Sequence, residues 1–70
     1  MRVLVDKFGI ETVEEVHSGC IKSGNKIIIS TYNNIGYTVE MRNSNEANTA
    51  LYNLLEKGYA DLSLGKFYPY

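Results

Sequence analysis

The sequence predicts a small α+β fold, in which an antiparallel β-meander of three to four strands packs against one C-terminal amphipathic α-helix and is followed by an aromatic tail. Two runs rich in β-branched and aromatic residues, joined by a polar turn, indicate the meander. Apolar residues that recur at the helical period indicate the helix. The length of 70 residues fits a single domain, 1–70, and a chain of this size buries only about 60% of its unfolded surface.

The strands are expected in the N-terminal part of the chain. In the run that begins at Tyr37, this residue, Val39 and Met41 alternate with polar residues, so the three side chains share the core-facing side. The turn before it, residues 33–36, holds Asn and Gly, which tolerate positive φ and make the flanking runs antiparallel neighbours. A second turn at residues 23–25 predicts that the preceding run pairs back in the same way. The expected strands cover about residues 1–6, 13–21, 26–33 and 37–42.

Residues 8–18 allow two interpretations. Thr12, followed three residues later by Glu15, has the spacing of a capping box, which would begin a short helix that ends at Gly19. The alternative is a strand that adds to the meander. We favour the strand, because three strands cover a helix better than a bare hairpin does.

The signals for a helix over 44–57 are the clearest in the sequence. Asn43, followed three residues later by Glu46, has capping-box spacing. Lys57 lies in the last turn, where a cation favours the helix dipole, and Gly58 follows where a left-handed residue ends a helix. One apolar stripe, which we expect to be buried, consists of Ala47, Ala50, Leu51, Leu54 and Leu55.

The charge balance argues against two classes of function, although a local charged patch is still compatible with it. Seven basic and eight acidic residues give a formal charge of −1. Nonspecific nucleic-acid binding needs a clear basic excess, and a nucleic-acid mimic needs a large acidic excess. The composition therefore argues against direct nucleic-acid binding.

The N-terminal residues and the cysteine content predict the compartment. The apolar run in residues 1–7 is interrupted by charge after three residues, whereas a secretory signal needs about 7–15 apolar residues and a membrane span about 20. Cys20 is the single cysteine, which fits a reducing compartment. We expect a cytoplasmic protein without a membrane partner.

The reactive residue types do not form a recognisable catalytic or metal-binding pattern. His17 and Cys20 have the spacing H-x-x-C, but a closed zinc site needs four ligands, and strand positions three apart point to opposite faces. Glu14 and Glu15 are adjacent and therefore diverge, unlike the carboxylate pair of a glycosidase. No phosphate-binding loop or nucleophile-elbow motif occurs. We therefore expect no enzyme activity, no metal and no cofactor.

Tyrosine is the unusual component of this sequence, with six tyrosines against two phenylalanines and no tryptophan. Tyrosine covers a large contact area with few rotors to order and is enriched at protein interfaces. Tyr37 is expected in the core, and the others either contact a partner or cover the small core with their hydroxyls in water. The candidate contact residues are Tyr52, Tyr59, Tyr68, Tyr70, Arg42 and Lys66, of which several lie in the tail 59–70.

The order of the elements resembles that of type II-A anti-CRISPR proteins, which are small phage-encoded inhibitors. The resemblance rests on the run 27–29, the Asn/Gly turn, the strand at 37–42 and the capped helix that ends in Lys57-Gly58-Tyr59, and it covers about half of the chain. It implies an inhibitor that blocks a host defence complex by covering its surface. Many of those inhibitors are strongly acidic, so the near-neutral charge of this chain argues against a DNA-mimic mechanism.

Two functions are expected from these observations. The first is a non-enzymatic protein-binding module, of the inhibitor kind that the resemblance implies, with a protein partner such as a host defence protein. The second is a homo-oligomer that binds a small ligand such as a nucleotide between subunits, because the core is small and the chain supplies aromatic rings and cations.

Overall fold

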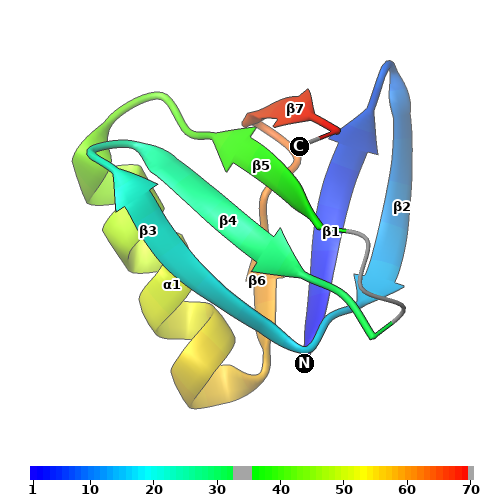
Figure 1. Ribbon diagram of the computed structural model, residues 1–70, viewed down its shortest axis with the longest axis horizontal. Helices are drawn as coiled ribbons and strands as arrows, with labels where there is room; N and C mark the ends of the chain where they lie inside the picture. The colour runs from blue at the N-terminus through cyan, green and yellow to red at the C-terminus, as the bar shows by residue number, and fades with distance from the viewer. Residues whose placement is uncertain (33–35, 70) are drawn as a thin grey trace.

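A computed structural model describes residues 1–32 and 36–69 of the chain (Figure 1). It confirms the predicted α+β class, with antiparallel strands and one helix packed on them. Within the described residues the strands are β1 (Arg2–Lys7), β2 (Ile10–Glu15), β3 (Ser18–Ser23), β4 (Lys26–Ser30), β5 (Tyr37–Glu40), β6 (Tyr59–Asp61) and β7 (Lys66–Tyr68), and the helix is α1 (Ser44–Lys57).

The strands form two sheets that share one core. The order is β2-β1-β6 in the three-stranded sheet and β3-β4-β5-β7 in the four-stranded sheet. Neighbours are antiparallel except β1 and β6, which run parallel with Arg2 opposite Tyr59. The predicted pairing of β4 with β5 is confirmed, and so is that of β3 with β4. Of the predicted turn at 33–36, residues 33–35 lie outside the described residues.

The predicted strand at 13–21 is wrong in its extent. The segment belongs to two strands in different sheets, β2 and β3. At the break, the Val16 N–H donates to the Met1 carbonyl at 2.8 Å and the His17 N–H donates to the Ser30 carbonyl at 2.7 Å. Val16 is fully buried at this point, so the chain passes through the core from one sheet to the other. The break depends on hydrogen bonds to Met1 and Ser30, which are distant in the sequence, so the local sequence pattern does not show it.

Residues 10–15 form a strand rather than a helix, as favoured, but β2 pairs with β1 in the three-stranded sheet and does not add to the meander of β3, β4 and β5. A tight turn joins β1 to β2. Phe8 has a φ of 55° and Gly9 a φ of 94°, and the Gly9 N–H donates to the Asp6 carboxylate at 2.7 Å. This turn holds Phe8 at the tip of the hairpin, where the ring is 78% exposed.

The helix begins and ends as its sequence predicts. The Asn43 side chain accepts a hydrogen bond from the Glu46 N–H at 2.9 Å, and Gly58 adopts the left-handed conformation with a φ of 73°. Ala47, Ala50 and Leu54 of the stripe are buried where α1 contacts β3, β4 and β6.

Leu55, which was predicted to be buried with the rest of the stripe, is 58% exposed. The helix packs through small alanines, so it lies close to the strands and only a narrow part of its surface is covered.

The predicted aromatic tail forms the last strand of each sheet. β6 completes the three-stranded sheet, and β7 lies at the edge of the four-stranded sheet, where Pro69 follows it. Gly65 lets the connecting loop approach β5, because a Cβ at this position would lie 2.7 Å from the Met41 sulfur and would also overlap Val39.

The two sheets meet around Phe67 of β7. Its ring centroid lies 5.4 Å from that of Phe8 and 5.0 Å from that of Tyr37. The Lys7 ammonium lies over the rings of Tyr37 and Phe67 and pairs with Glu14. Among the described residues, no helix is long and apolar enough to cross a membrane.

Candidate functional site

A row of apolar side chains lies on the outer face of the three-stranded sheet. Val13 on β2 lies opposite Leu4 on β1, and Tyr59 on β6 lies opposite Arg2, one step along the same face. The neighbouring positions Val3 and Ala60 point into the core and are buried, so the alternation of each strand turns this row outward. Val13 is 58% exposed and Tyr59 is 41% exposed.

Charged residues surround this row. The strand register places Arg2 opposite Glu15, Asp6 opposite Glu11, and Asp61 opposite Leu4. Acidic groups therefore exceed basic ones around an apolar centre. We call this surface the partner face; it consists of Leu4, Val13 and Tyr59, with Arg2, Asp6, Glu11, Glu15 and Asp61 around them.

Asp61 is a fixed negative charge at the edge of the partner face. Its carboxylate accepts a hydrogen bond from the Ser63 hydroxyl at 2.6 Å and another from the Ser63 N–H at 2.9 Å. These bonds, the hydroxyl first and the N–H second, lower the pKa of the Asp61 carboxyl below its ordinary value. The side chain is therefore ionised and held in one orientation at neutral pH.

A groove runs from Asp61 along the side of α1. Its volume is about 320 Å³, and it lies between the helix and the loop that follows β6. The lining is mainly apolar and includes amide, hydroxyl and carboxylate groups, and Leu64 is 84% exposed. The lining residues are Met41, Asn45, Glu46, Thr49, Ala50, Asn53, Asp61 and Leu64. The groove and the partner face thus share Asp61.

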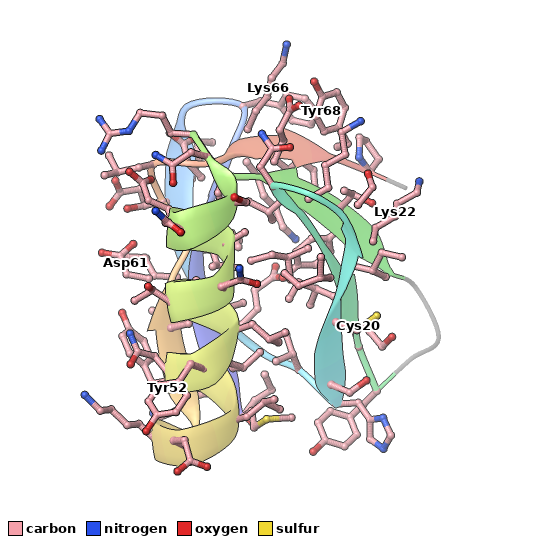
Figure 2. The ribbon with its side chains drawn as sticks, turned by 90° about the vertical axis from the view of Figure 1, so that its left-hand side faces the viewer. Cys20, Lys22, Tyr52, Asp61, Lys66 and Tyr68 are labelled. Atoms are coloured by element: carbon pink, nitrogen blue, oxygen red, sulfur yellow. The ribbon has the colours of Figure 1, made fainter. Side chains whose placement is uncertain are left out.

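The structure distributes the predicted contact residues over three surfaces. Tyr59 lies on the partner face, and Tyr52 is 62% exposed on α1; Figure 2 shows Tyr52 and Asp61 on the same side of the molecule. Lys66 and Tyr68 lie together on β7, on the outer face of the other sheet.

Arg42 and Tyr70 are the two remaining predicted contact residues. Arg42 precedes the helix and pairs with Glu46, with its Nε donating at 2.8 Å. Tyr70 lies outside the described residues. Tyr37 is buried as expected, 4% exposed, between the two sheets.

His17 and Cys20 do not approach each other in a way that builds a site. The His17 ring packs edge-on against Tyr32 with centroids 5.5 Å apart, and Cys20 is exposed on β3. Across residues 1–32 and 36–69, no three histidine, cysteine or carboxylate side chains cluster as metal ligands would.

Sequence reasoning missed Leu4, Val13 and Asp61 as candidate contact residues. The alternation in β2, with Val13 between two polar residues, shows that Val13 lies on one face of a strand, but not whether that face meets the core. The pairing of β1 with both β2 and β6 decides which face meets the core, and the residues around Val13 do not predict this pairing.

No protein-family model matches this chain, and neither a curated protein nor a solved structure does.

Proposed function

We propose that this chain is a non-enzymatic protein-binding module that acts by covering a surface of its partner with the partner face. The observation behind the proposal is the outward row of Val13, Leu4 and Tyr59 across three strands, in which Val13 and Tyr59 are exposed and Leu4 is half-buried. Contiguous exposed apolar surface with a polar rim is typical of protein interfaces, and tyrosine is frequent among the residues that dominate binding energy. The inhibitory role that the resemblance implies belongs to the same proposal.

The charges around the row specify the chemistry of the partner. Four carboxylates, those of Asp6, Glu11, Glu15 and Asp61, surround it with the single guanidinium of Arg2. A partner surface with an apolar centre and lysine or arginine residues around it would be complementary. Such charge complementarity increases the association rate and disfavours acidic partners.

Two substitutions test the proposal: both are made at equally exposed positions, and each adds one positive charge. Val13 and Leu55 are each 58% exposed, but only Val13 lies on the partner face. Immobilised wild-type protein, Val13→Arg and Leu55→Arg are incubated with host lysate, and the captured proteins are quantified by mass spectrometry. We expect at least one protein to be captured by wild type and by Leu55→Arg, and to be depleted on the order of tenfold or more with Val13→Arg, because a desolvated charge replaces an apolar contact.

Circular dichroism and thermal unfolding of both variants provide the control for folding. Equal capture by the two variants, while both remain folded, would contradict the assignment of the partner face. Capture lost only with Leu55→Arg would assign binding to the exposed side of the helix instead.

A further inference from the structure

The outer face of the four-stranded sheet carries a different set of side chains from the partner face. Alternation along β4 turns Ile27 and Ile29 into the core, so Lys26 and Ile28 point outward. Register then places Cys20 of β3 and Thr38 of β5 on either side of Ile28, with Tyr68 of β7 beyond Thr38. Figure 2 shows Cys20 and Lys22 on the side of the molecule opposite Tyr52 and Asp61.

Three lysines gather at one end of this outer face. Lys26 of β4 lies opposite Glu40 of β5, which lies opposite Lys66 of β7. Lys22 of β3 is the extra residue of a bulge, because Ile21 pairs with Ile27 but Ser23 pairs with Lys26. Neighbouring strands are about 4.8 Å apart, so the row of cations extends roughly 15 Å across the sheet. We call this surface the lysine face; it consists of Lys22, Lys26 and Lys66 with Ile28, Thr38, Glu40 and Tyr68.

A cavity of about 230 Å³ opens between two of these lysines and is lined by Lys22, Lys26, Thr38 and Tyr68. Thr38 points to this outer side but is only 4% exposed, because it lies beneath these longer side chains. The Tyr68 hydroxyl donates to Glu40 at 3.2 Å, and the Lys66 ammonium lies 5.4 Å from the centre of the Tyr68 ring. The cavity therefore presents ammonium groups, a hydroxyl and an aromatic ring to one ligand.

A second aromatic group lies at the other end of β3 and β4. His17 immediately precedes β3 and Tyr32 follows β4, and their rings pack together with Tyr32 67% exposed. From Lys26 to Ser30 the strand extends roughly 13 Å at about 3.3 Å per residue. Small hydroxyl residues, Ser18 and Ser30, occupy the surface between the lysines and this ring pair.

We propose that the lysine face binds single-stranded nucleic acid. Lys22, Lys26 and Lys66 would contact phosphates, and the rings of Tyr68 and Tyr32 would stack against bases. Proteins that bind single strands combine cations that follow the backbone with exposed rings on which bases stack. An acidic peptide would use the ammonium groups and leave the rings without a role.

The overall charge of −1 does not oppose this binding, because the fold separates the charges. The lysine face has three ammonium groups and one carboxylate, and that carboxylate, Glu40, lies between Lys26 and Lys66. The acidic surplus lies on the partner face, on the other side of the molecule. Composition alone averages the two faces and so conceals the local excess of positive charge.

Fluorescence anisotropy with labelled oligothymidylate of about 10 nucleotides tests the proposal. Binding is expected at low salt, and the logarithm of the binding constant should fall with the logarithm of salt concentration with a slope near −2, since three phosphate contacts contribute about 0.7 each. Lys22→Gln with Lys26→Gln should weaken binding on the order of tenfold or more and reduce the slope to about −0.7. Lys57→Glu changes the net charge by the same two units away from this face and should leave both quantities nearly unchanged.

Two further variants separate nucleic-acid binding from general attraction of anions. Glu40→Gln should strengthen binding, because it removes the carboxylate from the row and keeps an acceptor for the Tyr68 hydroxyl. Tyr68→Leu should weaken oligothymidylate binding several-fold without changing the salt slope, since stacking is lost and the phosphate contacts remain.

The following results would overturn the proposal. The proposal is wrong if oligothymidylate does not bind at low salt. It is also wrong if the lysine-face variant and the charge-matched control lose binding affinity to the same extent. Displacement of oligothymidylate by polyglutamate of the same charge at equal concentration would identify an acidic protein segment as the occupant instead. A duplex that binds as tightly as the single strand would exclude base stacking.

Discussion

At the scale of single residues, Tyr37 has the most constrained environment. Its ring lies between the two sheets, in contact with Phe67 and beneath the Lys7 ammonium. The hydroxyl is buried close to the Glu14 carboxylate, which itself pairs with Lys7. Burial first, and the neighbouring carboxylate second, raise the pKa of the Tyr37 phenol above its ordinary value. Tyr37 therefore keeps its proton in the folded state under conditions where an exposed tyrosine loses it.

This shift makes stability depend on alkaline pH. Below about pH 10 the phenol is protonated in both states and contributes no pH dependence. As the pH rises above that value the unfolded phenol ionises first, so the free energy of unfolding should fall, approaching about 1.4 kcal/mol per pH unit. The Tyr37→Phe variant should not show this fall in the free energy of unfolding at alkaline pH.

Urea unfolding of both proteins between about pH 8 and pH 11 isolates the effect. All other titrating groups are common to the two proteins, so the difference in stability between them reports on Tyr37. If the free energies of unfolding of the wild type and of Tyr37→Phe differ by the same amount at every pH in this range, the buried position of the phenol is contradicted.

At the scale of elements, the helix shows how packing selects among residues that a sequence pattern treats as equal. Leu54 and Leu55 belong to the same predicted stripe, yet Leu54 is 1% exposed and Leu55 is 58% exposed. Leu54 lies over Gly19 of β3, where an added Cβ would be 3.1 Å from the leucine. The missing side chain at Gly19 lets the helix approach closely and determines which leucine is covered.

Alanine substitutions of these two leucines should therefore differ strongly. We expect Leu54→Ala to lower the free energy of unfolding by about 2–5 kcal/mol, since it leaves a cavity in the core. Leu55→Ala should change it by less than about 0.5–1 kcal/mol, because alanine also has the higher helix propensity. Chemical denaturation of both variants measures this difference, and equal losses would mean that Leu55 is packed in solution.

Structural features that depend on residues close in the chain could be predicted from the sequence, and features that depend on pairing between distant segments could not. The ends of α1 and the pairing of β4 with β5 depend on residues close in the chain, so capping and alternation were sufficient. The pairing of β1 with β6 places Arg2 opposite Tyr59, and no pattern of neighbouring residues predicts this pairing. The partner face depends on that pairing, and the lysine face depends on β7 joining β5, so neither surface could be assembled from the sequence.

At the scale of the whole molecule, the two sheets enclose one core and expose two chemically different outer faces. One face is apolar with an acidic rim, and the other combines lysines with an aromatic ring. The core is continuous from Val3 through Ile29 to Leu54, and Phe67 and Phe8 connect the sheets at one edge. Neither sheet has a core of its own, so we expect the sheets and the helix to unfold together.

Cooperative unfolding can be checked with two optical signals. Far-ultraviolet circular dichroism reports mainly on α1, and near-ultraviolet circular dichroism reports on tyrosines in fixed surroundings, chiefly Tyr37. The two transitions should have the same midpoint in thermal and in urea unfolding. An earlier loss of the near-ultraviolet signal would show that the contact between the sheets opens before the helix does.

The parallel pairing of β1 with β6 joins two strands that are synthesised at different times. β1 is translated before its neighbour β6, and Tyr59, which pairs with Arg2, follows more than fifty residues later. At roughly 5–20 residues per second, the nascent chain spends several seconds with that side of β1 unpaired. An unpaired strand edge recruits other chains, and charged side chains beside such an edge oppose that pairing, so we expect Asp6, Glu11 and Glu15 to reduce aggregation of the nascent chain.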